Sequence, residues 1–523
     1  WAPDPIRRPS VSPVPEPSSR ANPLAEGIGA GRFCYVVELV ASALQREAKL
    51  LEVASRLARV PDVVAGSITS YAGGAMGHDP IRVGTAARAR GLTPNVHVTC
   101  VGQDRRGLRK TLEDLHALGI RNVFALTGDW PRARPGSPPL EAPVFDIDSV
   151  QLVRLVDELR RTGRAFHTAV AVSPFKYVEG DCVWQYLKLE KKIAAGADCA
   201  ITQVGWDAEK FRELKRYVDE RGLRTPLLGN VYVLGPRAAE RMAGGEPPGC
   251  WVSPALLETV RQEARGKDGG LRARLERAAR TVAVLQGLGY AGAYVGGTHD
   301  ADHVAWIIRR ARQLASRWEE LAAELRYGPE GGFYLYAGPT ARGAIPMGGA
   351  PAAGPPPVPG SKRLAVPTDE EAPWRRSVAR LLDGLGRLFP VTRDTPLRRV
   401  LARLAAWADR RPAVAHAVER GELAIKQPLF GCRACGNCVL GHLEYVCPET
   451  CPKHLRNGPC GGTYLGRCEV VDQPCVWVGV QARAGAAGRE RDLLTYVPPA
   501  DRTLQGTSSW INYLLDRDSR PGT

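Results

Sequence analysis

Eight cysteines near the C-terminal end of the sequence form its densest set of chemically active side chains. The first three follow the spacing Cys-x2-Cys-x2-Cys, which lets thiolates of one loop hold a single metal centre and suits an iron–sulfur cluster. Eight thiolates suffice for two four-ligand sites, either two 4Fe–4S clusters or one cluster and a zinc ion, and a purely structural zinc module is the alternative. The predicted metal ligands are Cys432, Cys435, Cys438, Cys447, Cys451, Cys460, Cys468 and Cys475.

Two carboxylates make a second set of candidates, because each stands near the end of an apolar, β-rich run. Glu38 lies in the first such run and Asp129 directly follows the fourth. A buried carboxyl group has a raised pKa and can donate a proton, while an ionised one can stabilise a cation on a substrate. The alternative is that Glu38 pairs with an arginine inside the fold and Asp129 merely caps the next loop. Together with His97 and Gln203, the two acids favour a functional site.

The elements that must position these residues are eight apolar runs that alternate with amphipathic helical stretches. Strands buried on both faces have such continuous apolar sequences. Eight β units with intervening helices predict an α/β fold of the (β/α)8 TIM-barrel type, in which all strands end at one mouth. A doubly wound open sheet is the alternative, but no Gly-x-Gly-x-x-Gly motif follows the first run. The predicted strands are residues 34–40, 62–69, 95–100, 122–128, 165–172, 199–205, 226–234 and 291–297.

Composition sets the predicted domain boundaries. Residues 1–30 are Pro- and Ser-rich and predicted to be disordered, and residues 31–330 hold the barrel. Residues 338–370 are a Gly/Pro-rich linker. Residues 371–490 combine predicted helices with the cysteine-rich metal-binding module, and residues 491–523 are predicted to be a tail with a short helix.

Charge and hydropathy limit the cellular compartment and the kinds of binding partner that we expect. No run of about 18 apolar residues occurs and the first residues lack the apolar core of a signal peptide, so we expect a cytoplasmic protein without a membrane segment. In reducing cytosol, clustered cysteines bind metal rather than form disulfides. The net charge of +16 comes from arginines spread over most predicted helices, without a nucleic-acid motif. We expect no nucleic-acid partner. An anionic small substrate or an acidic protein partner fits this charge, and a general richness in arginine explains it at least as well.

Three runs of the barrel region resemble signatures of the methylenetetrahydrofolate reductase family. They are NVHVTC (95–100), GIRNVFALTGDWP (119–131) and LKLEKKIAAGADCAITQ (187–203), and the resemblance covers roughly residues 32–300. The run from CRACGNC to GPCGG resembles the cysteine-rich C-terminal domain associated with some of these reductases. In certain bacteria that domain is a separate partner subunit of the barrel protein, whereas here both parts lie in one chain.

The resemblance implies a barrel that binds FAD or FMN and reduces 5,10-methylenetetrahydrofolate to 5-methyltetrahydrofolate, a step of one-carbon metabolism and methionine biosynthesis. Glu38 would be the general acid that helps open the imidazolidine ring to the 5-iminium cation, and Asp129 would favour that cation beside the flavin ring. The hydride would come from flavin N5. The implied cofactor-binding residues are Thr69, His97, Thr127, Gly128, Asp129 and Lys192. The implied substrate-binding residues are Gln203, Asn230 and Tyr232.

The sequence also departs from the family pattern in places that concern the cofactor and the electron donor. Gln185 and Lys188 replace the Asp and Asn usual in the bacterial single-subunit enzymes, and the seventh predicted strand lacks their Phe. The electron donor therefore stays open between NAD(P)H and an acidic redox protein such as ferredoxin, with the cysteine domain relaying electrons to or from the flavin. We also expect a homo-oligomer. The alternatives are a folate-binding methyl-transfer component without flavin and a non-catalytic, zinc-stapled subunit.

Overall fold

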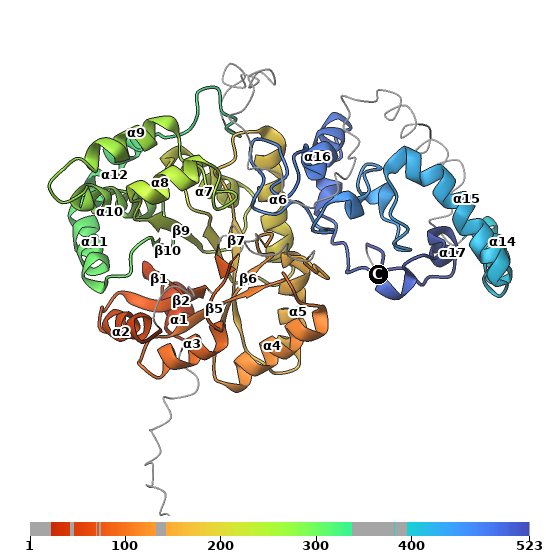
Figure 1. Ribbon diagram of the computed structural model, residues 1–523, viewed down its shortest axis with the longest axis horizontal. Helices are drawn as coiled ribbons and strands as arrows, with labels where there is room; N and C mark the ends of the chain where they lie inside the picture. Colours follow the sequence, from red (N-terminus) through yellow and green to blue (C-terminus); the bar gives the residue numbers. More distant parts are fainter. Residues whose placement is uncertain are drawn as a thin grey trace, which may run out of the picture.

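The structure is a computed structural model that describes residues 22–41, 47–69, 71–72, 75–131, 143–336, 381 and 395–521 (Figure 1). The linker predicted at 338–370 lies outside these residues. So does the helical segment predicted at 374–389, apart from Leu381. Both remain predictions.

The predicted (β/α)8 barrel is confirmed. Eight parallel strands close in the order β1-β10-β9-β8-β7-β6-β5-β2. Each predicted strand corresponds to an observed one, and the differences lie at the ends. The barrel strands are β1 (Cys34–Val40), β2 (Val63–Thr69), β5 (Pro94–Thr99), β6 (Asn122–Leu126), β7 (His167–Val172), β8 (Cys199–Thr202), β9 (Leu227–Tyr232) and β10 (Gly292–Gly296).

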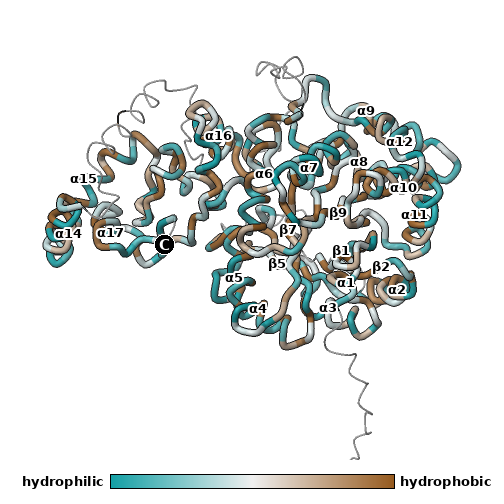
Figure 2. Tube along the Cα trace, turned by 180° about the vertical axis from the view of Figure 1, so that it is seen from behind, coloured by the Kyte–Doolittle hydropathy of each residue, from teal (hydrophilic) through white to brown (hydrophobic). Residues whose placement is uncertain are grey.

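Helices follow the strands and surround the barrel. Their apolar faces pack on the sheet; in Figure 2, hydrophobic residues alternate with hydrophilic ones along these helices. The sequence also fixes where many of them begin, as at α5, where Asp148 and Gln151 form a capping box. The helices are α2 (Glu47–Leu57), α3 (Pro80–Arg88), α4 (Arg105–Ala117), α5 (Ser149–Arg161), α6 (Glu179–Ala194), α7 (Ala208–Glu220), α8 (Pro236–Ala243), α9 (Pro254–Glu263), α10 (Leu271–Gly287), α11 (Ala301–Leu314) and α12 (Trp318–Glu324).

The N-terminal segment differs from its prediction. Disorder to residue 30 is wrong for residues 22–30, because α1 (Pro23–Gly29) packs against the base of the barrel. Leu24 is buried in the apolar cluster inside the barrel, and Asn22 donates a hydrogen bond to the Asn122 side chain at 2.8 Å. Leu24, the partly buried Ile28 and one cap, set in a Pro-rich context, give too little periodicity to predict this helix.

A short hairpin after β2 was not predicted either. The strands β3 (Tyr71–Ala72) and β4 (Ala75–Met76) pair antiparallel outside the barrel. Two residues per strand are too few to show an alternating pattern in the sequence.

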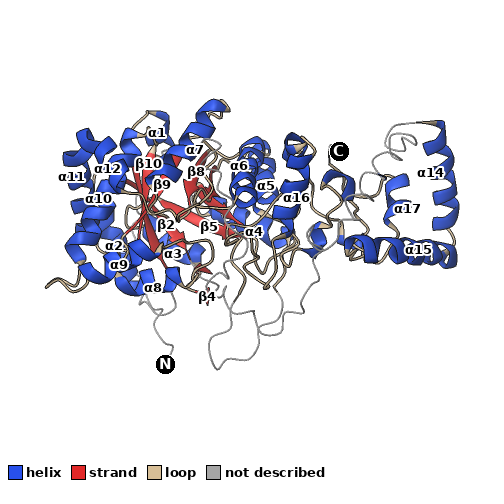
Figure 3. Cartoon of the chain, turned by 90° about the horizontal axis from the view of Figure 1, so that it is seen from above, coloured by secondary structure: helices blue, strands red, loops and turns tan. Residues whose placement is uncertain are grey.

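The C-terminal region lies against one side of the barrel. Figure 3 shows α16 (Val476–Ala486) beside α6, with α14 (Pro396–Asp409) and α15 (Pro412–Phe430) at the end of the molecule away from the barrel. The cysteine loops connect α15 to α16. Where α6 meets α16, the buried rings of Trp184 and Trp477 lie edge to face with centroids 5.2 Å apart. The barrel and the cysteine region thus share an apolar core.

Residues 491–521 contain the expected short helix, α17 (Ser509–Leu514), but the rest does not hang free as a tail. Gln151 on α5 donates to the carbonyl of buried Val497 at 2.9 Å, and Arg105 on α4 donates to the carbonyl of buried Ala500 at 2.6 Å. This segment therefore ties the cysteine region to the barrel.

Within the part of the chain that the structure describes, no helix has both the length and the apolar character needed to cross a membrane.

Candidate active site

A cavity of about 510 Å³ opens at the carboxyl ends of the barrel strands. All ten barrel residues predicted from the sequence to form the site line this one cavity, as the shared mouth of a barrel requires. They are Glu38, Thr69, His97, Thr127, Gly128, Asp129, Lys192, Gln203, Asn230 and Tyr232. The structure brings them together, while their individual roles stay predictions.

Glu38 reaches the cavity from β1, and the barrel encloses its carboxyl group. Burial raises the pKa of this carboxyl group to about 7. Among the described residues Glu38 makes no ion pair, so the alternative of an arginine partner inside the barrel finds no support. Its carboxylate instead lies near the rings of Tyr232 and Tyr294, whose pKa values are raised first by burial and then by Glu38. A carboxyl group that titrates near neutrality is suited to general-acid work.

Asp129 reaches the same mouth through a tight turn after β6. Gly128 makes this turn with φ +90°, a left-handed conformation that favours glycine, and a Cβ at this position would lie 2.8 Å from Val101. The negative charge of Asp129 is among the influences that raise the pKa of Lys453, a residue of the cysteine region. The turn thus places a carboxylate beside a cation from the other domain.

His97 is held as a neutral ring on β5. Burial lowers its pKa to about 3, so the imidazole carries no charge at neutral pH. Its Nε2 lies 2.9 Å from the Ser67 hydroxyl, and its ring packs edge to face on Phe124 with centroids 4.8 Å apart. His97 can therefore orient a ligand by hydrogen bonding but not by charge.

Lys192 and Asn230 add a cation and an unsatisfied acceptor to the cavity. Lys192 donates to the Ala171 carbonyl at 2.6 Å, and burial lowers the pKa of its ammonium group to about 7. The buried Asn230 Oδ1 accepts no hydrogen bond from any described residue. A buried acceptor that faces a cavity without a partner indicates a ligand that supplies the donor.

The cysteine region forms one wall of this cavity, which the sequence did not predict. Lys453, Cys460 and Glu469 line it together with the barrel residues. The approach is close: a Cβ on Gly249 of the barrel would lie 2.3 Å from the carbonyl oxygen of Gly461. In the sequence, the glycines Gly461 and Gly462 next to Cys460 indicate that something packs closely there. They do not indicate that the barrel is what packs against them.

Two side chains of α6, Lys188 and Gln185, bind main-chain carbonyls of the cysteine region where it lines the cavity. Lys188 on α6 donates to Gly458 at 3.1 Å and to Pro459 at 2.8 Å, and Gln185 donates to the Cys460 carbonyl at 3.1 Å. Gln185 and Lys188 are two of the positions at which the sequence departs from the family pattern. In this chain they bind the cysteine region.

The eight cysteines fall into two groups of four. Those of the first group line a small cavity of about 30 Å³ between the thiol loops and α15. In the second group, burial and then the neighbouring thiol groups raise the pKa of Cys475. The first group is Cys432, Cys435, Cys438 and Cys447, and the second is Cys451, Cys460, Cys468 and Cys475.

All eight cysteines are free thiols. Among the described residues no three His, Cys, Asp or Glu side chains stand in an arrangement that could hold a metal ion. The four thiol groups of each set are nevertheless suitable metal ligands, since four cysteines bind a 4Fe–4S cluster or a structural zinc ion. The second group reaches the barrel cavity through Cys460.

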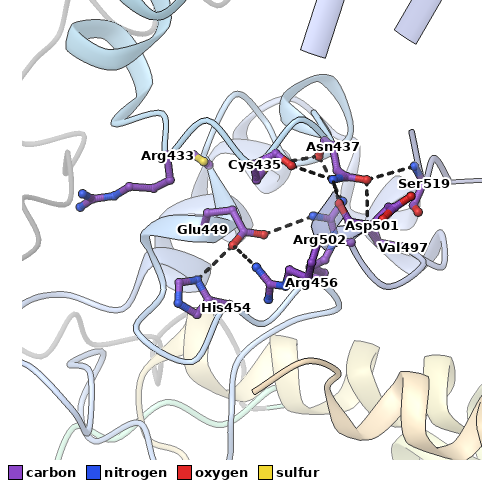
Figure 4. A network of polar contacts seen from close by, with 12 residues as sticks. Arg433, Cys435, Asn437, Glu449, His454, Arg456, Val497, Asp501, Arg502 and Ser519 are labelled. Atoms are coloured by element: carbon purple, nitrogen blue, oxygen red, sulfur yellow. Dashed lines mark hydrogen bonds and ion pairs between the residues drawn. The ribbon is translucent and has the colours of Figure 1, made fainter. Parts of the chain in front are cut away.

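Buried polar side chains fix the loops of the first group (Figure 4). Asn437 donates to the carbonyls of Cys435 at 2.7 Å and of Asp501 at 2.9 Å. Glu449, buried beside the same cavity, pairs with Arg456 at 3.2 Å and with His454 at 3.0 Å. Such buried polar contacts help to hold the loops in one conformation.

Comparison with known protein families gives two matches. Residues 25–244 match the model described as methylenetetrahydrofolate reductase. Residues 411–503 match the model described as methylene-tetrahydrofolate reductase C terminal. The first covers most of the barrel, and the second covers all eight cysteines of the two thiol groups.

Individual proteins are similar over shorter stretches. Methylenetetrahydrofolate reductase 2 of Schizosaccharomyces pombe is 26% identical over 44% of this chain and 37% of that protein. The 5,10-methylenetetrahydrofolate reductase of Pectobacterium carotovorum subsp. carotovorum is 33% identical over 24% of this chain and 39% of that protein. The chain spans between 22% and 44% of the length of the curated relatives that it matches.

A solved structure titled "Uncharacterized protein from Clostridium thermocellum binds two copies of 5-methyl-5,6,7,8-tetrahydrofolic acid" is similar over 56% of this chain and 99% of that chain. The identity is 12% and the TM-score 0.39, a likeness too weak to say anything about the ligand of this chain.

Proposed function

The chain joins a methylenetetrahydrofolate reductase domain to the C-terminal domain named after the same enzyme, and we propose that it reduces 5,10-methylenetetrahydrofolate to 5-methyltetrahydrofolate with a bound flavin. The observation that carries the proposal is the composite cavity. Glu38 and Asp129 of the barrel and Cys460 of the second thiol group line one space. A proton donor (Glu38), a carboxylate (Asp129) and a potential metal ligand (Cys460) would therefore all lie next to the flavin and the folate.

A flavin fits this cavity by size and by chemistry. The volume of about 510 Å³ falls within the range of roughly 300–1,000 Å³ usual for cofactor and ligand sites. Apolar residues of β6 and β7 line its walls and suit an aromatic ring system, while Asn230 Oδ1, an acceptor without a donor, stays assigned to the substrate. We assign Thr69, His97, Thr127, Gly128 and Lys192 to the cofactor, which when bound would supply the hydride.

The chain's own residues would prepare the substrate for that hydride. Glu38, half protonated near pH 7, donates its proton to N10 of the folate, and the bond between N10 and the methylene carbon breaks. The lone pair of N5 then forms the double bond to that carbon, which leaves a 5-iminium cation. Asp129, as the carboxylate, stabilises this cation electrostatically, while Gln203 and Tyr232 orient the pterin ring.

We assign the two thiol groups to 4Fe–4S clusters that carry electrons; the alternative is zinc, which has no redox chemistry and would be purely structural. The second group supports this role because Cys460 reaches the cavity. Electrons would enter from an acidic redox protein or from NAD(P)H. The net charge of +16 supports the acidic protein, since complementary charge speeds docking.

Anaerobic purification of the full chain tests the proposal. We expect flavin and iron–sulfur absorbance in the visible spectrum, and reduction of methylenetetrahydrofolate when reduced methyl viologen supplies electrons. A colourless protein that binds 5-methyltetrahydrofolate without turnover would instead support the methyl-transfer component. Zinc without flavin or folate binding would support a stapled, non-catalytic subunit.

A further inference from the structure

Lys453 belongs to the cysteine region, yet its ammonium group lies in the barrel mouth. Its side chain is 2% exposed, and its Nζ donates to the Gly128 carbonyl at 2.8 Å. The same ammonium lies 5.5 Å from the centre of the Phe145 ring, which also belongs to the barrel. A buried cation from one domain thus contacts the turn that carries Asp129 in the other.

The partner of this cation also comes from the cysteine region. Glu469, 1% exposed, forms an ion pair with Lys453. Beyond that pair, neither carboxylate oxygen of Glu469 accepts a hydrogen bond from a described residue. A buried charge is tolerated only when an opposite charge compensates for its lost hydration. Glu469 therefore keeps Lys453 charged and in place next to Gly128.

Structural stability alone does not explain this arrangement. Lys191 joins the two domains without entering the cavity: it donates to Leu493 at 3.2 Å and to Thr495 at 2.8 Å. Lys453 differs, because both it and Glu469 line the cavity with Glu38 and Asp129. The pair is placed to act on the bound molecules through Asp129.

We propose that Lys453, held by Glu469, is a positioning residue of the barrel site: it fixes the Gly128–Asp129 turn and keeps the Asp129 carboxylate aimed into the cavity. The cysteine region would then complete the catalytic site as well as carry metal. This inference rests on the proposed function for its effect on turnover, but the position of the turn can be measured independently.

The test uses the full chain and four variants. Lys453→Met removes the cation, and Lys453→Met combined with Glu469→Gln removes both charges, so that no unpaired carboxylate is left buried. Lys453→Arg keeps the charge. Lys191→Met is the matched control, since it removes a buried lysine of the same domain interface that lies outside the cavity.

Hydrogen–deuterium exchange reports the position of the turn without any turnover. We expect amide exchange in the peptide that contains Gly128 and Asp129 to rise at least tenfold in Lys453→Met and in the double variant. In Lys191→Met and Lys453→Arg it should stay within twofold of wild type. Unchanged exchange in the double variant, or an equal rise in Lys191→Met, would overturn the inference.

Kinetics give the second readout. With methylenetetrahydrofolate and reduced viologen, kcat of the double variant should fall at least tenfold while KM stays within threefold, and Lys191→Met should keep the wild-type kcat. A smaller fall in kcat would contradict the inference. If wild type itself shows no turnover, the proposed function fails, and the exchange result alone decides whether Lys453 positions the turn.

Discussion

At the scale of single residues, Glu38 is the proposed general acid, and its burial leads to a prediction about the pH dependence of turnover. Burial raises the pKa of its carboxyl group to about 7, so the protonated acid becomes scarce above that pH. We expect kcat to fall as pH rises through 7. Glu38→Gln should lower kcat by about 10²–10⁴-fold, the usual contribution of a general acid, and should remove this limb of the pH profile. Glu52→Gln, on the exposed side of α2, is the control.

The raised pKa of Glu38 also makes the free energy of unfolding depend on pH. The folded state holds the Glu38 proton more tightly than the unfolded state does, so this contribution is complete at acidic pH and is lost as pH rises through about 7. Unfolding of Glu38→Gln should therefore depend less on pH between about 4.5 and 7 than unfolding of wild type.

For the kinetic prediction, a kcat profile of wild type that stays flat from pH 6 to 8 would contradict the role of Glu38 as general acid.

Residues of the barrel site were predictable from the sequence because the fold itself gathers them. Once Glu38 and Asp129 are assigned to strand ends of one barrel, geometry requires them to share a mouth. Lys453 and Glu469 were not predictable in this way. They sit among metal-ligand candidates, and only the docking of the cysteine region on the barrel brings them to the cavity.

At the scale of elements, α6 is the link between the two domains, and Trp184 is its central side chain. Its ring is fully buried against Trp477, and its Nε1 donates to the Trp477 carbonyl. Trp184→Ala should lower the free energy of unfolding by about 3–5 kcal/mol, because it leaves a cavity and removes a buried hydrogen bond between α6 and α16. Urea denaturation followed by circular dichroism measures the loss.

Trp407→Ala provides the comparison, since this ring on α14 is 51% exposed. Its loss should change the free energy of unfolding by no more than about 0.5 kcal/mol. Equal losses in the two variants would mean that the packing of α6 on α16 contributes little to stability.

The strands were predictable because parallel, doubly buried strands have unbroken apolar sequences. The short elements were not: α1 depends on a single buried leucine and a cap, and β3 and β4 on two residues each. For residues 491–500 the difficulty was another one. Leu493 and Val497 pack into the apolar core shared with α6, but main-chain carbonyls bound by Arg105 and Gln151 also hold the segment, and a carbonyl group cannot be recognised from the sequence.

At the scale of the whole molecule, the two thiol groups predict two independent metal sites. Cys435→Ser should remove the metal of the first group alone, and Cys468→Ser that of the second group alone, because each group supplies four ligands of its own. Cys34→Ser, which changes a buried cysteine of β1 in the barrel, should leave the metal content unchanged. Metal analysis of each variant per chain, together with its visible absorbance, provides the measurement. Loss of all metal from either single variant would contradict two separate sites.

The most direct test of the account is anomalous diffraction at the iron and zinc edges from anaerobically grown crystals of the full chain with flavin. We predict flavin density in the cavity lined by Glu38 and Asp129, and an iron signal enclosed by Cys451, Cys460, Cys468 and Cys475 on its wall. A cavity without flavin, or a metal in the second group that Cys460 does not bind, would contradict the claim that barrel and cysteine region form one redox site.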